Sequence, residues 1–369
     1  MSQETLSTRA SVGSHHAATR NDHIMGIDSL RAVAALTVML DHLGLTPPDI
    51  FAAHHSAVFS AIRMVLNCLF NGPAAVVIFF VVSGFFIHLP QTRKNTELNI
   101  PRFYVRRGIR IGIPAMLAFL CFEKAGIATA TGSLLVKINS TVLWSIVCEV
   151  TYYFLYPAIL LAGKNFGWVK TVIIAYLVAF ALCLTHLNTL RAAGNAYVAL
   201  HLWTWVVGLP CWILGCWLAE NRQKFRPATI TKIWLWRFAI FAVAFLLRVA
   251  KFHFHSVVFS NCFTLNLFAL PVTAWIGLEL VSSTNLGTSR ILEWIGQWSF
   301  SLYLIHPTAW YCLHVLGIPY VNSAQWYHLL SIVTALISSF IFYLVVEKPS
   351  HLLAVQLSRR TPKLAWATL

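Results

Sequence analysis

The sequence predicts an all-α polytopic membrane protein with about ten transmembrane helices and both termini in the cytoplasm. Of its 369 residues, 58% are hydrophobic and only 11% are charged, whereas soluble proteins carry about 25% charged residues. Apolar windows of about 20 residues, the length that crosses a bilayer as a helix, recur along the whole chain. These windows are continuous and lack the alternation of barrel strands, so helices are the predicted spanning elements.

The predicted transmembrane helices are residues 27–44, 73–90, 107–123, 141–163, 168–186, 198–220, 233–250, 257–281, 297–317 and 327–347. The shorter apolar segment 56–70 is predicted to be a re-entrant or interfacial piece. Residues 1–26 are polar and lack the apolar core of a signal peptide, so we predict a flexible cytosolic tail there. The membrane domain then covers residues 27–350, and residues 351–369 form a short cytosolic C-terminal tail.

The formal net charge of +15 is distributed unevenly between the two predicted sides. With the N-terminus inside, the inner segments and their adjoining helix ends hold 20 of the 27 Lys and Arg residues, and the outer segments hold six. This asymmetry fits the positive-inside rule and an even number of spans. It predicts a multi-pass protein of the cell (inner) membrane whose basic groups contact anionic membrane lipids. We expect no nucleic-acid partner, and the sequence leaves the oligomeric state open.

Ionisable groups inside a span cost about 2.5–3.5 kcal/mol each on insertion scales, so each needs a structural or functional reason. In the first window, Arg31 and His42 lie on nearly the same helix face, about 16 Å apart along the axis. Arg31 is then near the cytosolic surface and His42 near the outer one, so one face carries an anion-binding group and a potential general base. The alternative is that Arg31 snorkels to lipid phosphates and His42 caps the outer helix end.

A cluster of arginines follows the second window. Arg106 and Arg107 lie four and three residues before Arg110, so the three share one helix surface. Guanidinium groups bind phosphate in a bidentate manner, and the alternative is ordinary positive-inside charge. Ser83, in the middle of the second window beside Gly84, is a candidate ligand contact or part of a close helix-packing site.

Glu149, in the fourth window, lies at roughly the depth of His42. Its carboxylate is a candidate for orienting the imidazole, or for binding a sugar hydroxyl together with Trp144 and Tyr153. The alternative is a buried ion-pair partner for a nearby Arg or Lys.

The ninth window contains Tyr303 and His306. His306 is either a second functional histidine or a hydrogen-bonded structural one. Glu347, at the inner end of the tenth window, is predicted to pair with the arginine cluster in a structural role. The eight cysteines lie mostly within spans and form no CxxC pair, so neither disulfides nor a zinc site is predicted.

These stretches, in this order, resemble the motifs of the acyltransferase 3 family of integral membrane acyltransferases. The family's leading motif, an Arg and a His separated by ten residues, is reproduced by Arg31 and His42. Its later motifs are similar to residues 79–87 with Arg107 and Arg110, to residues 144–157, and to residues 299–306 and 347–349. Glu149 matches the first glutamate of a family pair, while Val150 replaces the second. The resemblance covers about residues 25–350.

The resemblance implies transfer of an acyl group, commonly acetyl from cytosolic acetyl-CoA as co-substrate, to a hydroxyl of a cell-surface or lipid-linked glycan. It implies a catalytic His42, with Glu149 and Arg31 as further catalytic candidates. The donor is then bound by Arg31, Ser83, Arg106, Arg107 and Arg110. We expect the acceptor to contact Trp144, Tyr153, Tyr303 and His306, and we expect no metal.

Two mechanisms remain open for His42: general-base activation of the acceptor hydroxyl, or covalent transfer through an acyl-histidine. The acceptor glycan and the acyl chain length are also open. A different class of function, a proton-coupled transporter or flippase of a glycan or lipid, fits buried His, Arg and Glu as well. No inverted repeat is visible in the sequence, which disfavours that class.

Overall fold

The computed structural model describes residues 26–44, 57–93, 97–128, 133–192, 200, 203–254, 261–286, 289–319 and 325–362. Every regular element in these ranges is a helix, so the predicted all-α class is confirmed for the described part of the chain. Nearly all of the predicted N-terminal tail lies outside the described residues. Residues 351–360 of the predicted C-terminal tail are helical.

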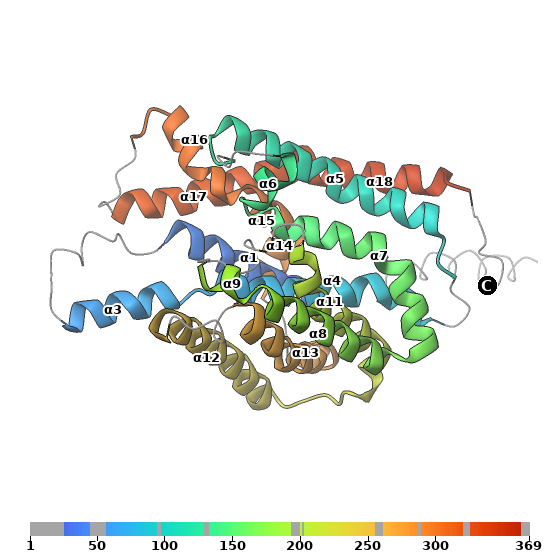
Figure 1. Cartoon of the computed structure of the whole chain (residues 1–369). Helices are drawn as coiled ribbons and strands as arrows, with labels where there is room; N and C mark the ends of the chain where they lie inside the picture. The colour runs from blue at the N-terminus through green and yellow to red at the C-terminus, as the bar shows by residue number, and fades with distance from the viewer. Residues whose placement is uncertain are drawn as a thin grey trace, which may run out of the picture.

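The described α-helices form a bundle whose arrangement is shown in Figure 1. In chain order they are α1 (Ile27–Leu43), α3 (Ala57–Cys68), α4 (Gly72–His88), α5 (Ile100–Lys124), α6 (Leu134–Asn139), α7 (Trp144–Phe166), α8 (Trp168–Thr185), α9 (Leu187–Ala192), α11 (Thr204–Asn221), α12 (Ile230–Phe254), α13 (Asn261–Leu286), α14 (Arg290–Gln297), α15 (Ser299–Ile305), α16 (Ala309–Val315), α17 (Gln325–Phe342) and α18 (Lys348–Arg360). Short 3-10 helices follow α4 (η1, Leu89–Thr92), α11 (η3, Arg222–Lys224) and α15 (η5, His306–Thr308), and a π-helical turn (η6, Tyr343–Glu347) joins α17 to α18.

Six helical stretches of the described chain are long and apolar enough to cross a membrane. They are Val58–Thr92, Trp144–Phe166, Trp168–Thr185, Ile230–Phe254, Cys262–Ser282 and Trp326–Arg360. Each of the ten predicted windows overlaps a helix, but the count of ten spans and the cytoplasmic termini stay predictions. The ninth window is interrupted by η5, and the segment predicted to be re-entrant contains α3.

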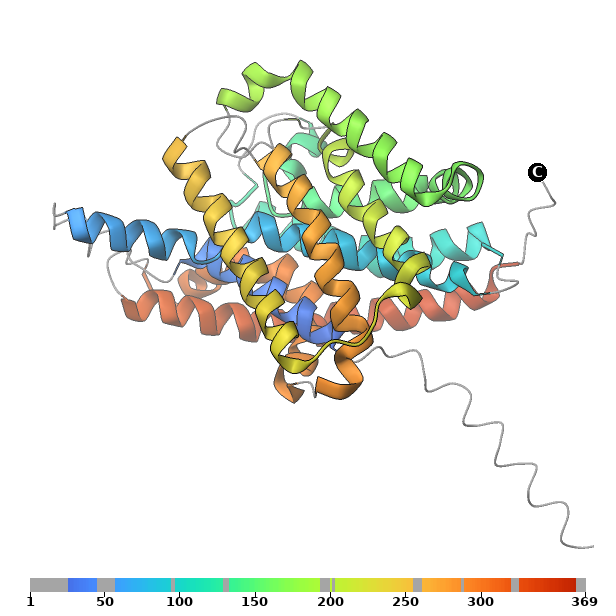
Figure 2. The ribbon, with the colours of Figure 1, turned by 90° about the horizontal axis from the view of Figure 1, so that it is seen from below.

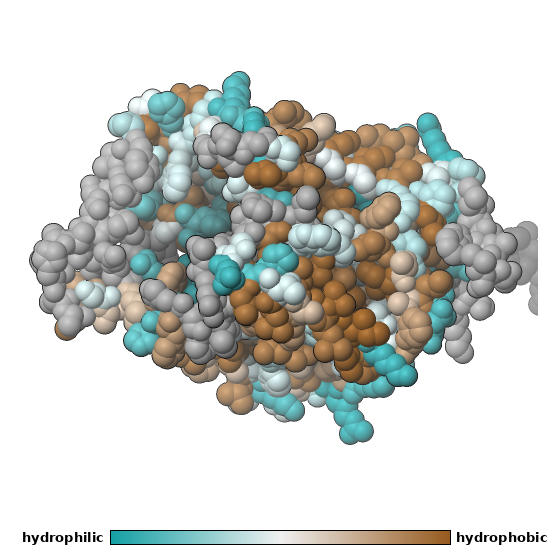
Figure 3. All heavy atoms as spheres, viewed as in Figure 1, coloured by the Kyte–Doolittle hydropathy of each residue, from teal (hydrophilic) through white to brown (hydrophobic). Residues whose placement is uncertain are grey.

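The outer surface of the bundle is largely apolar, as Figure 3 shows on one face. Large hydrophobic side chains such as Phe154, Phe238 and Val345 are exposed there. Such a surface is unfavourable in water and suits contact with lipid chains. The chain is therefore a multi-pass membrane protein.

The centre of the bundle depends on close packing of α4 against α11. A Cβ atom added at Gly84 would lie 1.9 Å from the carbonyl oxygen of Trp212, and one at Gly215 would lie 2.1 Å from that of Val81. Glycine at both positions thus lets the two backbones touch, as small residues do between membrane helices. Figure 2 shows α12 and α13 side by side on another face, and α18 packs along α5 (Figure 1).

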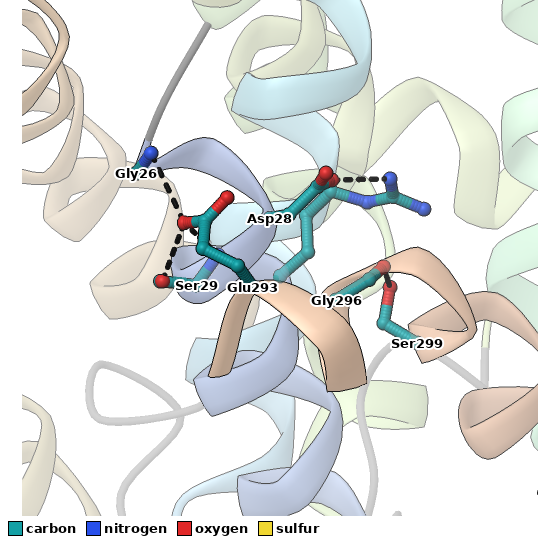
Figure 4. A network of polar contacts seen from close by, with 7 residues as sticks. Gly26, Asp28, Ser29, Glu293, Gly296 and Ser299 are labelled. Atoms are coloured by element: carbon teal, nitrogen blue, oxygen red, sulfur yellow. Dashed lines mark hydrogen bonds and ion pairs between the residues drawn. The ribbon is translucent and has the colours of Figure 1, made fainter. Parts of the chain in front are cut away.

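The first turn of α1 is held by α14 (Figure 4). Glu293 accepts hydrogen bonds from the Gly26 N–H (3.1 Å), the Ser29 N–H (3.2 Å) and the Ser29 hydroxyl (2.6 Å). The carboxylate thereby satisfies backbone donors that have no partner within the helix, and its charge suits the helix N-terminus. A Cβ at Gly296 would lie 2.0 Å from the Asp28 carbonyl oxygen, so α14 lies directly against this turn.

Candidate active site

A cavity of about 660 Å³ lies between α1, α4, α5, α7, α15 and the junction of η6 with α18. Its volume is within the range of small-molecule binding sites. Its charged and polar lining residues are Asp28, Arg31, Ser83, Arg107, Arg110, Ser145, Glu149, Tyr153, Gln297, Tyr303, Tyr343, Glu347, Lys348 and His351.

One end of the cavity is basic. Arg107 and Arg110 are three residues apart on α5 and share one face of that helix. Asn99 caps the helix by accepting the Arg102 N–H (3.1 Å), which fixes the start of α5 two turns before these arginines. Arg31 reaches the cavity from α1 and contacts Asp28 at 3.2 Å.

The opposing acidic groups at this end are already engaged. Glu347, in the π-helical turn, accepts hydrogen bonds from the Ser301 N–H (3.1 Å) and hydroxyl (2.5 Å). The whole cavity lining carries four basic side chains, Arg31, Arg107, Arg110 and Lys348, and three carboxylates, Asp28, Glu149 and Glu347. The balance favours an anionic ligand.

A cluster of hydrogen-bonded groups forms the middle of the cavity wall. Ser83 donates to Glu149 Oε1 (2.8 Å) and accepts from the Trp212 indole N–H (3.2 Å). The Tyr153 hydroxyl also donates to Glu149 Oε1. The Arg107 guanidinium lies 5.8 Å from the Tyr153 ring centre, which places the basic end directly beside this cluster.

Tyr303 lines the cavity beside Ser145, away from the basic end. Its hydroxyl lies 2.6 Å from Ser145 Oγ and donates to the Val142 carbonyl (2.9 Å). Its ring packs edge-on against Phe79, with centroids 5.7 Å apart. Ser145 and Tyr153, eight residues apart on α7, both line the cavity, which therefore extends about 12 Å along that helix.

His42 is not among the residues that line the cavity. Its Nδ1 lies 2.8 Å from Nε2 of His306, and the His306 ring lies 6.4 Å from the Tyr303 ring. Tyr303 is therefore the lining residue whose contact with His306 connects the cavity wall to the histidine pair. Arg31 and His42 are predicted to share nearly one helix face; in the structure Arg31 lines the cavity and His42 does not.

The carboxylates near His42 have other partners. Asp41 forms an ion pair with Arg248 and accepts the Gly72 N–H at 3.2 Å. Glu149 contacts Ser83 and Tyr153, as described above. The hydrogen-bond partner that the structure gives the His42 ring is His306 and not Glu149.

The structure brings most of the predicted site residues into one cavity: Arg31, Ser83, Arg107, Arg110, Glu149, Tyr153 and Tyr303. It places Arg106, Trp144, His42 and His306 outside the lining. Arg106 is exposed on α5, and Trp144 is buried against Phe80, with ring centroids 6.4 Å apart. The packing alternative for the Ser83–Gly84 pair is confirmed, because Gly84 packs against α11; Ser83 lines the cavity, and its contact with a ligand stays a prediction.

Several lining residues are not predicted from the sequence, among them Asp28, Ser145, Lys348 and His351. Asp28 lies one helical turn before Arg31, and that spacing was a usable signal. Lys348 lies at the predicted end of the membrane domain and His351 at the start of the predicted cytosolic tail. No sequence pattern therefore indicates that either residue lines a cavity. Within the described ranges, no group of three His, Cys, Asp or Glu side chains is arranged to hold a metal ion.

Comparison with known proteins gives one family and one relative. The sequence profile of the family described as "Acyltransferase domain" matches residues 24–344. A protein of Bacillus subtilis (strain 168) named "Putative peptidoglycan O-acetyltransferase YrhL" is 24% identical over 382 aligned residues. The alignment covers 91% of this chain and 56% of that protein, so the chain spans just over half the length of this relative. No solved structure matches.

Proposed function

The chain belongs to the acyltransferase 3 family; from this premise we propose that it is an acyltransferase that transfers an acetyl group from acetyl-CoA to a hydroxyl of a cell-surface or lipid-linked glycan. The similar protein from Bacillus subtilis carries peptidoglycan O-acetyltransferase in its name. Peptidoglycan is therefore one acceptor to test, beside lipopolysaccharide and exopolysaccharide. We place the protein in the cell (inner) membrane with the arginine end of the cavity facing the cytosol.

The observation that carries this proposal is the single cavity shared by Arg31, Arg107, Arg110 and the Ser83–Glu149 pair. CoA is a polyanion with a long flexible arm. Its phosphates are matched by the guanidinium groups at the basic end, which bind phosphate through parallel N–H donors. The arm then extends past Ser83 and Glu149 and brings the thioester toward Tyr303.

His42 is the proposed catalytic group, and the acceptor approaches it from the other end of α1. In the direct route, its imidazole takes the proton of the acceptor hydroxyl while the hydroxyl oxygen bonds to the acetyl carbon. The carbon–sulfur bond breaks, and the CoA thiolate takes the proton from the imidazolium. In the covalent route, the imidazole nitrogen bonds to the acetyl carbon and the carbon–sulfur bond breaks to release the CoA thiolate. The acceptor hydroxyl then attacks the acetyl-imidazole and releases the ring nitrogen, and its proton passes to the CoA thiolate. Either route requires the thioester to pass from the cavity to His42, and it does so beside Tyr303, whose ring lies 6.4 Å from that of His306.

The proposal is tested with purified protein, acetyl-CoA labelled in the acetyl group, and isolated peptidoglycan, lipopolysaccharide or exopolysaccharide. We expect label in the glycan and stoichiometric release of free CoA. His42→Ala should abolish both while the protein still inserts into the membrane. Normal transfer by that variant overturns the catalytic assignment, and transport of an acceptor without CoA release supports a transporter instead.

A further inference from the structure

The pairing of His42 with His306 defines the protonation of both rings. His306 is the first residue of η5, and its side chain is completely buried. Its Nδ1 lies 3.0 Å from the carbonyl oxygen of Leu302, one turn earlier. A carbonyl oxygen only accepts hydrogen bonds, so Nδ1 of His306 carries the proton.

The protonation state of the second ring nitrogen of His306, Nε2, follows from this. Among the described residues the hydrogen-bond partners of this ring are His42 and the Leu302 carbonyl, neither of them a carboxylate, and burial then disfavours a charged ring. A neutral imidazole with its proton on Nδ1 has a lone pair on Nε2. That Nε2 lies 2.8 Å from Nδ1 of His42. The His42 nitrogen must therefore donate, which leaves the lone pair of His42 on its own Nε2.

The ring geometry supports a directed hydrogen bond between the two histidines. Their planes are inclined by only 16°, and their centroids are 5.1 Å apart. The distance between centroids exceeds the nitrogen–nitrogen distance of 2.8 Å by 2.3 Å. This difference is about twice the distance from the centre of an imidazole ring to one of its nitrogens, so both nitrogens lie on the line between the ring centres. The rings thus point at each other edge to edge, with the N–H directed along the line between them.

We propose that His306 is a positioning residue that fixes His42 as the Nδ1-protonated tautomer and presents the unprotonated Nε2 for acyl transfer. The inference rests on the proposed function, because it gives that reaction its base or nucleophile. His306 here has the role that a buried carboxylate has in serine hydrolases, where loss of the correct histidine tautomer lowers turnover about 10⁴-fold. The two carboxylates considered for this role have other partners, since Asp41 is bound to Arg248 and Glu149 to Ser83.

A matched pair of substitutions separates positioning from packing. In His306→Gln, the amide oxygen takes the place of Nε2 and can still accept the His42 N–H. In His306→Asn, the shorter amide takes the place of Nδ1, so it can still meet the Leu302 carbonyl but cannot reach His42. We expect His306→Gln to keep kcat within about tenfold of the wild type. We expect His306→Asn to lower kcat about 10²- to 10⁴-fold, with the KM for acetyl-CoA unchanged.

The tautomer itself is measured without any reaction. In protein labelled with ¹⁵N-histidine, two-bond ¹H–¹⁵N correlations at neutral pH distinguish the two neutral tautomers, and the His42 signals are those lost in His42→Gln. We expect the Nδ1-protonated form in the wild type and in His306→Gln, and a mixture or the other form in His306→Asn. An Nε2-protonated His42 in the wild type, or equal kcat losses in the two variants, overturns the proposal. Failure of the wild type to transfer acetyl would instead reject the proposed function and leave the tautomer result standing.

Discussion

The contact between α4 and α11 permits a quantitative prediction about the packing behind the cavity. One methyl group added at Gly84 lies 1.9 Å from the Trp212 carbonyl oxygen, against an ordinary contact distance of at least 3.4 Å. The two helices must therefore separate locally by about 1.5 Å, the difference between these distances. Overpacking of a well-packed interface costs about 1–3 kcal/mol.

Gly84→Ala should thus lower the free energy of unfolding by about 1–3 kcal/mol. It should also lower acetyl transfer, because Ser83 and Trp212, which share a hydrogen bond across this interface, move apart with their helices. Gly112, on an exposed part of α5, is the matched control, since a Cβ there meets nothing within 4 Å. Gly112→Ala should stabilise the protein by up to about 1 kcal/mol, because alanine is the better helix former.

The assay is thermal unfolding of the purified variants in detergent, followed by size-exclusion chromatography of the protein that stays folded. A third variant, Gly215→Ala, adds a methyl group to the same interface. Because both substitutions separate the same two helices, the double variant with Gly84→Ala should lose less stability than the sum of the losses in the two single variants. If Gly84→Ala unfolds at the wild-type temperature, or if Gly112→Ala is the less stable of the two, the described packing of α4 on α11 is refuted.

Three further predictions concern the cavity and α1. Arg107→Ala or Arg110→Ala should raise the KM for acetyl-CoA about 10- to 100-fold, because each loses a charge-assisted contact with phosphate. Arg106→Ala, at an exposed position, should change this KM little. Steady-state kinetics measure all three variants, and equal increases in KM would indicate an effect of general surface charge. Glu293→Ala should lower the free energy of unfolding by about 0.5–2 kcal/mol, because the cap on the first turn of α1 is lost. Glu293→Gln keeps a hydrogen-bond acceptor and should lower it less. Thermal unfolding compares the two variants, and an equal loss of stability would contradict the capping role of Glu293. Tyr303→Ala should enlarge the cavity and raise the kcat/KM ratio of butyryl-CoA to acetyl-CoA, while Tyr303→Phe keeps the wild-type ratio; an unchanged ratio in Tyr303→Ala contradicts its position in the cavity wall.

Much of the fold was predictable because membrane helices have a strong local signal. A bilayer requires long apolar segments, and every predicted window overlaps a helix in the structure. Breaks inside such a window carry no comparable signal. The interruption at η5 coincides with Pro307, but other prolines of this chain, such as Pro157 and Pro210, lie inside unbroken helices. Glu347 in the π-helical turn accepts a hydrogen bond from Ser301, a contact that no local pattern reveals.

The candidate site was predictable where spacing along one helix decides which residues meet. Arg107 and Arg110 share a helix face by their sequence separation, and both line the cavity. Contacts between distant helices were not predictable in the same way. Glu149 and His42 have similar predicted depths, but depth does not give rotation about the helix axis, and Glu149 turns toward Ser83. The partner of His42 comes from a residue 264 positions later in the chain.

Binding of acetyl-CoA in the central cavity is the central claim of the proposed function. Electron cryomicroscopy of the full chain with acetyl-CoA, using a bound antibody fragment for alignment, tests it directly. We predict density for the CoA phosphates at Arg107 and Arg110, with the thioester beyond Glu149 and directed at Tyr303. CoA density on another face of the protein, with this cavity empty at saturating acetyl-CoA, would contradict the claim.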